Sequence, residues 1–183
     1  TLIVYFLLAL YLTIALLSYS ASDPGFTTTG STVEVANAVG VYGAWMADAL
    51  LHVFGYLAFG FPILLAYKVY TSFREEQLRA EYSWAMFGFR ALGYSLLFLA
   101  SCGLATIHFN VPEDVPYIAG GVLGSVVVDL SLPLFANLGS TLLLLAIFLF
   151  GLTISASISW LNVIDKLGAW TLGTISLLTA KGQ

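Results

Sequence analysis

The side chains best suited to chemistry are two ionisable residues, Asp48 and His52, in an otherwise apolar stretch. They are four residues apart, and Trp45 and Gly55 continue the spacing, so all four fall on one face of a helix. An aspartate at the centre of a bilayer costs about 2.5–3.5 kcal/mol, so its presence in a span indicates a role. We expect Asp48 to lie near the outer end of its span, where this cost is smaller.

Three interpretations of the Asp48 and His52 pair are open. The side chains could pack against a neighbouring helix or a water pocket. They could instead take part in partner binding or gating, or form a metal or proton-relay site with His108. Two histidines on different helices without a third ligand are a weak metal pattern. An intramembrane hydrolase is a further alternative, for which we find no convincing nucleophile or water-activating set.

Catalytic motifs are absent from the sequence. It has no phosphate-binding loop, serine elbow or zinc-binding helix motif, and no basic patch interleaved with aromatics. We therefore expect no enzyme activity, no cofactor, no metal and no direct nucleic-acid binding in these residues.

Composition excludes a soluble domain. Of the 183 residues, 60% are hydrophobic and 9% are charged, against about 25% charged in soluble proteins. The single cysteine, Cys102, lies in an apolar run, so it can form neither an intrachain disulfide nor a cysteine metal cluster and is expected to be a small packing residue.

Four apolar segments have the roughly 20 residues that a spanning helix needs. They predict an all-α integral membrane protein, a four-transmembrane-helix bundle forming a single domain over 1–183, with helices at about 1–20, 43–67, 87–107 and 138–161. Boundary aromatics stand at segment ends: Trp45, Tyr67, Trp84 and Trp160. The uncharged start favours a membrane helix, whose cytoplasmic leader lies outside this sequence, over a signal peptide.

The basic residues predict the orientation. All six lie in or beside two stretches, the connection 68–86 and the tail 162–183: Lys68, Arg74, Arg79, Arg90, Lys166 and Lys181. The connections 21–42 and 108–137 carry acids only. The positive-inside rule therefore makes both termini cytoplasmic and these two loops external.

The outer loops differ in character. The first is polar and turn-rich, and Asp23, Pro24 and Glu34 are our candidates there for contact with partners. The second contains residues 115–128, which are uncharged but too short to span, so we expect a re-entrant or interfacial helix that Pro133 separates from the fourth span. A five-helix alternative would break the charge pattern.

The cytoplasmic-side tail 162–183 keeps helical spacing. It is either an amphipathic helix on the inner leaflet or a fraying continuation of the fourth helix.

Small residues indicate close helix contacts, either inside the bundle or between subunits. One series, Gly151, Ser155 and Ser159, follows a face of the fourth helix, and Gly120 and Gly124 have the same spacing in the outer segment.

Several strings in a fixed order make the chain resemble the N-terminal four-helix membrane domain of the FtsK/SpoIIIE family, the bacterial DNA translocases of the division septum. These strings are Ser18-Tyr19-Ser20-x-Ser22-Asp23-Pro24, Gly43-Ala44-Trp45-x-Ala47-Asp48, Phe54-Gly55, Ser101-Cys102-Gly103-Leu104-Ala105, Gly120-Gly121-Val122-Leu123-Gly124 and Trp160-Leu161-x-Val163-Ile164-x-Lys166-Leu167-Gly168.

The resemblance implies a membrane anchor and cell-division scaffold, in the bacterial inner membrane at the septum, that couples chromosome segregation to septum formation. Its implied partners are the lipid bilayer, other membrane division proteins and further copies of itself, as a hexamer formed through the motor. ATP, magnesium and DNA would bind only to the motor and DNA-reading modules, which these residues lack. An oligomeric channel or transporter subunit is the alternative.

Overall fold

The computed structural model describes residues 2–28, 35–75, 84–112 and 115–156, with the isolated residues 165, 169 and 171. Every regular element within these residues is helical, which confirms the predicted all-α class. The elements are α1 (Leu2–Leu17), α2 (Gly40–Phe54), the 3₁₀ helix η1 (Gly55–Phe59), α3 (Gly60–Glu75), α4 (Trp84–His108) and α5 (Gly121–Ala156).

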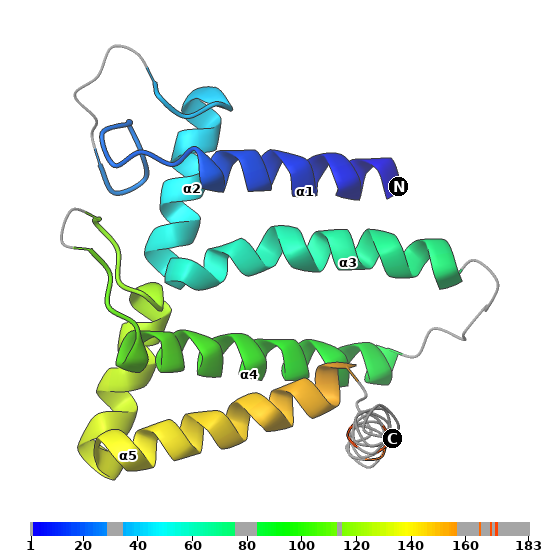
Figure 1. Cartoon of the computed structure of the whole chain (residues 1–183), viewed down its shortest axis with the longest axis vertical. Helices are drawn as coiled ribbons and strands as arrows, with labels where there is room; N and C mark the ends of the chain where they lie inside the picture. The colour runs from blue at the N-terminus through cyan, green and yellow to red at the C-terminus, as the bar shows by residue number, and fades with distance from the viewer. Residues whose placement is uncertain are drawn as a thin grey trace, which may run out of the picture.

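The helices run in two directions. Figure 1 shows α1, α3, α4 and the second part of α5 side by side along one direction, with α2 and the first part of α5 crossing one end of them. Three stretches are long and apolar enough to cross a membrane, Gly40–Thr71, Phe87–His108 and Gly121–Ser155, and Leu2–Leu17 is a shorter apolar helix. The fold is therefore a membrane helical bundle with two helices lying across one end, which we call the surface helices: α2 and residues 121–135 of α5.

The prediction of one continuous helix over 43–67 is wrong. The chain leaves α2 at Gly55, whose φ of 58° and ψ of −138° end the helix, and η1 then leads into α3. Only glycine adopts such a conformation without strain. The apolar run was long enough for a span, but its first part belongs to α2, which has 15 residues and is about 22 Å long at 1.5 Å per residue. Asp48 and His52 therefore lie on α2, which crosses the end of the bundle, and not on the helix that follows the break.

α5 changes direction inside its length. Ala136 has φ 52° and ψ −176°, and it divides the surface helix from the last spanning segment. The predicted fourth span, 138–161, starts just after this kink, whereas the helix expected at 115–128 begins at Gly121. The change in direction lies at Ala136 instead of Pro133. The end of the predicted span and the tail 162–183 lie outside the described residues, apart from the three isolated ones.

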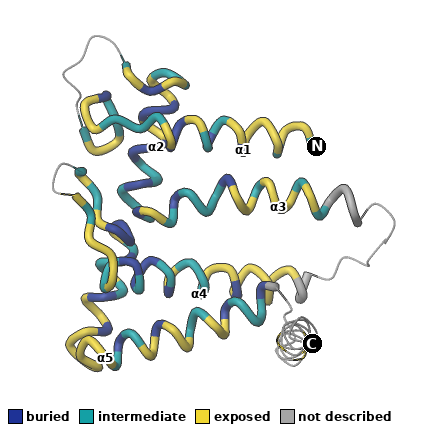
Figure 2. Tube along the Cα trace, viewed as in Figure 1, coloured by how far each residue is buried: buried dark blue, intermediate teal, exposed yellow. Residues whose placement is uncertain are grey.

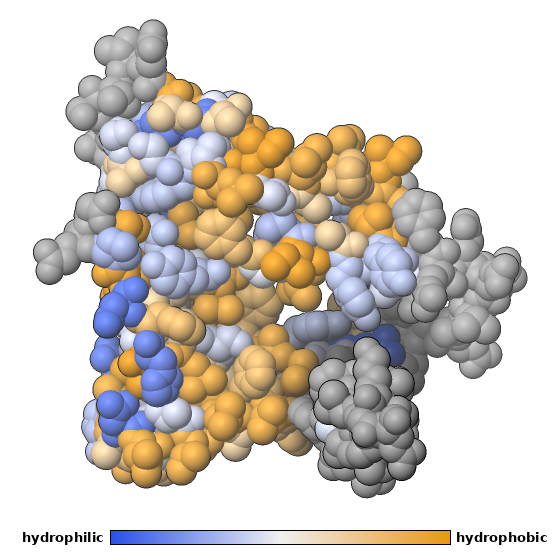
Figure 3. Space-filling view, in the orientation of Figure 1, coloured by the Kyte–Doolittle hydropathy of each residue, from blue (hydrophilic) through white to orange (hydrophobic). Residues whose placement is uncertain are grey.

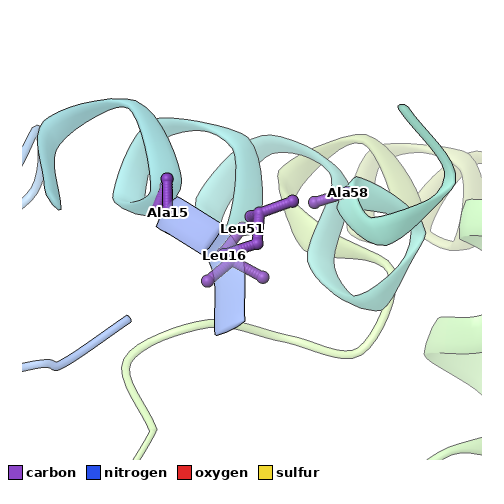
Figure 4. Packing of buried hydrophobic residues seen from close by; sticks show 5 residues of the cluster. Ala15, Leu16, Leu51 and Ala58 are labelled. Atoms are coloured by element: carbon purple, nitrogen blue, oxygen red, sulfur yellow. The ribbon is translucent and has the colours of Figure 1, made fainter. Parts of the chain in front are cut away.

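Small residues fill the interior, while large apolar residues face outward (Figures 2 and 3). Residues such as Ile3, Ile63 and Leu142 are 74%, 68% and 59% exposed. One buried cluster joins α1, α2 and η1 (Figure 4): Ala15, Leu16, Ala47, Leu51 and Ala58. Helices in lipid associate through close packing of small residues rather than through a hydrophobic core, and this distribution follows that rule.

Glycines bring α4 and α5 into close contact. A Cβ added to Gly151 would lie 2.7 Å from the Leu97 nitrogen and 2.8 Å from the Gly93 oxygen. Ser155, one turn further, is buried as well. The described part of the predicted small-residue series therefore lies at a contact within the chain, and Ser159 lies outside the described residues.

The second glycine pair packs near the other end of α4. A Cβ on Gly120 would collide with the Cys102 carbonyl, and one on Gly124 with Thr106 Oγ1. Cys102 is itself fully buried. These glycines let the start of α5 cross α4 at close range.

Candidate functional site

Asp48 is the centre of a hydrogen-bond network at the end of the bundle that the surface helices cover. Its side chain is only 3% exposed. Oδ1 accepts a hydrogen bond from the Tyr19 hydroxyl at 3.1 Å, and Oδ2 accepts from the Thr27 N–H at 2.6 Å and the Thr27 hydroxyl at 2.8 Å. Hydrogen bonds to an ionised carboxylate are among the stronger ones in proteins. Asp48 thus ties the first outer loop to α2.

The loop backbone passes very close to this carboxylate. A Cβ added to Gly25 would lie 2.6 Å from Asp48 Oδ2. The turn closes on itself through Gly25 N–H, which donates to the Thr28 carbonyl at 2.9 Å. Glycine at position 25 is therefore required by the close approach of the loop to α2.

A second carboxylate organises the return of the loop. Asp23 is 2% exposed and accepts from the N–H groups of Ala36 and Asn37, both at 2.8 Å. The Asn37 amide then donates to the carbonyls of Ala15 and Ser18, at 2.8 and 3.3 Å. Carbonyls at the C-terminus of a helix have no partner within the helix. Asn37 supplies one for the end of α1.

Burial and a nearby negative charge act together on Tyr19. Desolvation, and then the charge of Asp48, raise the pKa of the Tyr19 hydroxyl above its ordinary value. The phenol therefore stays protonated at physiological pH and keeps donating to Asp48. Burial, and next Tyr56, likewise raise the pKa of Tyr117.

Aromatic contacts extend from this network in two directions. Tyr117 of the second outer loop lies edge-on to Tyr19 and to Tyr56, with ring centroids 5.9 and 6.0 Å apart. Edge-to-face pairs at this distance are favourable. The tyrosines link the two outer loops through the start of η1.

An exposed aromatic pair stands beside the network. Trp45 of α2 packs edge-on against Phe26 of the first loop at 5.5 Å. The two side chains are 51% and 56% exposed, and Tyr42 on the same helix is 86% exposed. This pair is the most prominent aromatic surface of the first loop.

The second outer loop borders an open hollow of about 390 Å³. Its described lining comes from the end of α4 and residues 109–119, and it includes Thr106, Asn110 and Tyr117 but no charged side chain.

The structure separates the residues that helical spacing grouped together. Asp48 is buried, Trp45 is exposed and His52 is half-buried. His108 lies at the end of α4, where its Nε2 is 3.1 Å from Thr141 Oγ1. No three His, Cys, Asp or Glu side chains among the described residues come together as a metal site would require.

The three residues predicted as partner contacts in the first outer loop have different outcomes. Asp23 is used by the loop itself, Pro24 is half-buried, and Glu34 lies outside the described residues. The sequence analysis missed the partners of the carboxylates: Tyr19, Thr27 and Asn37. The available signal was an asparagine and threonines between two apolar segments, since such side chains bond to nearby backbone.

The hydrogen bonds of Asp23 and Asp48 hold the first outer loop in a defined position. Both acids of the network accept hydrogen bonds from two or more donors, and these bonds hold the loop against α1 and α2. What it presents to a partner is the shape of the loop and the exposed aromatic pair.

The chain matches known proteins along most of its length. Residues 1–168 match the family described as the 4TM region of DNA translocase FtsK/SpoIIIE. A DNA translocase FtsK of Pseudomonas putida is 44% identical over 93% of this chain and 20% of its own length, and one of Vibrio parahaemolyticus is 38% identical over 98% of this chain and 17% of its own length. The chain thus spans about a fifth of these relatives. No solved structure matches it.

Proposed function

The chain belongs to the FtsK/SpoIIIE family of DNA translocases, as their four-helix membrane region, and we propose that it anchors such a translocase in the inner membrane and recruits it to the division septum. The match over residues 1–168 to this membrane region carries the proposal. Through this anchor, the motor of the full-length protein would couple chromosome segregation to septum formation. ATP, magnesium and DNA would act at that motor and not in these residues.

The distribution of charge supports an orientation with both termini in the cytoplasm. Arg90 belongs to the first turns of α4, which starts at the end of the bundle where α1 begins, and Lys68 lies midway along α3 (Figure 1). Asp23 and Asp48 lie at the opposite end, with the surface helices. Basic residues stay on the cytoplasmic side of a membrane. The surface helices and both outer loops would therefore face the periplasm.

The exposed pair Trp45 and Phe26 is our candidate for contact with other membrane division proteins. Aromatic residues with large exposed faces are common in protein interfaces. The Asp48 network beneath holds the loop in place, so the pair is ordered before a partner arrives. Preorganisation of this kind reduces the entropy lost on binding.

An exchange of anchors tests the proposal. In a cell whose only FtsK-type translocase carries this region, residues 1–183 would be replaced by four unrelated spanning helices with the same orientation. We expect the hybrid to reach the membrane but to lose recruitment to the septum, seen by fluorescence microscopy. Normal recruitment and division with the unrelated anchor would contradict the proposal.

A double variant locates the surface. Trp45→Ala with Phe26→Ala should insert normally and reduce septal recruitment. The matched control is Phe89→Ala, which removes an aromatic side chain of 66% exposure from α4, and it should leave recruitment unchanged. Equal recruitment of both variants would remove this pair from the proposed surface.

Leakage of a small solute from liposomes that contain the purified region separates the anchor from the channel alternative. An anchor leaves the vesicles tight, whereas a channel releases the solute.

A further inference from the structure

The spanning helices form two pairs that separate with distance from the surface helices. α3 packs along α1, and α4 packs along α5, but α3 and α4 have few contacts with each other. They meet close to the surface helices, where the ring centroids of Phe61 and Phe98 are 5.2 Å apart and a Cβ added to Gly60 would lie 3.4 Å from Phe98. Beyond this aromatic contact, Figure 3 shows a hollow between the two pairs.

Helical spacing identifies the residues on the two walls of this hollow. On α3, Leu64 and Lys68 follow the aromatic contact at intervals of three and four residues, and on α4, Tyr94 and Ala91 precede it at intervals of four and three. Side chains at this spacing share one face of a helix. Leu64 and Tyr94 are 36% and 38% exposed, and Lys68 and Ala91 are exposed as well. We call the space between these two faces the α3–α4 cleft.

Two basic side chains lie at matching depth on the walls of the α3–α4 cleft. Lys68 is seven residues from Phe61 on α3, and Arg90 is eight residues from Phe98 on α4. At 1.5 Å per residue, both are about 10–12 Å from the aromatic contact. Arg90 is one helical turn from Tyr94, so it lies at the edge of the same face, and it is exposed. The cleft therefore has a cation on each side.

Neither Lys68 nor Arg90 forms an ion pair with a residue that the structure describes. Asp23, Asp48 and Asp129 lie in the first outer loop and the surface helices, at the other end of the bundle. Both basic residues nevertheless belong to stretches that are long and apolar enough to cross a membrane. A cation in a span is costly unless it is paired or its side chain reaches the membrane surface. An anion from outside the described chain would remove this cost.

We propose that the α3–α4 cleft binds an anionic phospholipid of the cytoplasmic leaflet, with the lipid phosphate held between Lys68 and Arg90. An acyl chain of the same lipid lies against Leu64 and Tyr94. A phospholipid matches both the charge and the apolar walls, and basic residues between spanning helices on the cytoplasmic side bind anionic headgroups in other membrane proteins. A protein segment fits less well, because the cleft lies within the depth of the membrane. The proposal rests on the orientation proposed above but not on recruitment to the septum.

Native mass spectrometry of the 183-residue chain, purified in detergent, tests the lipid site. The probes are dioleoylphosphatidylglycerol, which is anionic, and dioleoylphosphatidylcholine, which is zwitterionic and has the same acyl chains. We expect the chain to retain one phosphatidylglycerol at lipid concentrations where it retains no phosphatidylcholine. Lys68→Gln with Arg90→Gln should weaken this retention about thirtyfold, because each basic residue near an anionic lipid contributes roughly fivefold.

Two matched controls separate the site from net charge and from general surface effects. Arg74→Gln with Arg79→Gln removes the same amount of positive charge and should retain phosphatidylglycerol as the wild type does. Ala91→Trp fills the cleft while both of its bases remain, so it should reduce retention. Leu92→Trp adds the same ring at a position that is 52% exposed on another face of α4, and it should leave retention unchanged.

Several results would overturn the proposal. One is equal retention of the two lipids by the wild type, and another is undiminished retention of phosphatidylglycerol after loss of Lys68 and Arg90. Displacement of the lipid by inorganic phosphate alone would show an anion site in which the acyl chain has no part, and displacement by pentaglutamate would assign the cleft to an acidic protein segment. Septal recruitment does not enter this measurement, so the lipid site and the proposed anchor function can fail separately.

Discussion

The two surface helices begin and end with similar backbone conformations, but their aspartates lie in different surroundings. Asp48 of the first is buried and receives three hydrogen bonds from the outer loop and Tyr19. Asp129, its equivalent, is exposed and accepts no hydrogen bond from the described residues. The carbonyls of Ile118 and Ala119 lie against the kink at Gly55, whereas Ala136 is exposed. Similar backbone conformations therefore occur in two settings, one packed against the second outer loop and one exposed.

The largest effect should come from the covered kink. Gly55→Ala adds a Cβ against the carbonyls of Ile118 and Ala119 at a positive φ. We expect a loss of about 3 kcal/mol or more, because backbone strain and overpacking act together. Thermal unfolding in mild detergent measures it.

The open kink gives the matched control. Ala136→Gly relieves the positive φ of an alanine and should leave stability unchanged or raise it by about 1 kcal/mol. Wild-type stability in Gly55→Ala would show that Ile118 and Ala119 do not pack against the Gly55 kink as described.

A smaller difference is expected between the two aspartates. Asp48→Asn replaces an acceptor of three hydrogen bonds by an amide of similar size, which should loosen the first loop by about 1–3 kcal/mol. Amide hydrogen exchange of residues 19–28 measures the loosening. Asp129→Asn should change stability by less than about 0.5 kcal/mol, and equal exchange in both variants would count against the network.

The smallest effect concerns the Tyr19 hydroxyl. Its pKa is raised in the folded protein, so its contribution to stability is complete below its unfolded pKa and declines as pH rises above it. We therefore expect the first loop to begin to loosen only as the pH rises above about 10. Tyr19→Phe should lose about 1 kcal/mol at neutral pH and show a weaker response to alkali. The same response in both proteins would assign the loosening to another group.

Features of the fold that depend on composition could be predicted from the sequence, whereas the positions of the two kinks, which depend on local backbone geometry, could not. Apolar length and placement of bases predicted a helical membrane bundle. Averaging hydropathy over 43–67 hid the break at Gly55, although the glycine itself is a visible signal. The kink at Ala136 has no such signal, since alanine rarely adopts a positive φ.

Of the candidate site, the central carboxylate could be predicted from the sequence but its hydrogen-bond donors could not. Asp48 stood out because it was charged in an apolar run. Its donors, Tyr19 and Thr27, come from distant points of a loop whose path is set by tertiary contacts.

Thiol labelling of intact cells tests the central claim, that a surface helix precedes the second span. In a Cys102→Ala chain, Tyr56→Cys lies just after the Gly55 kink, at the outer boundary, whereas one helix over 43–67 would bury it at mid-membrane. We predict that a membrane-impermeant maleimide added outside labels position 56 as it labels Tyr42→Cys, and labels Arg90→Cys only after permeabilisation. Labelling at 42 with full protection at 56 would contradict the structure described here.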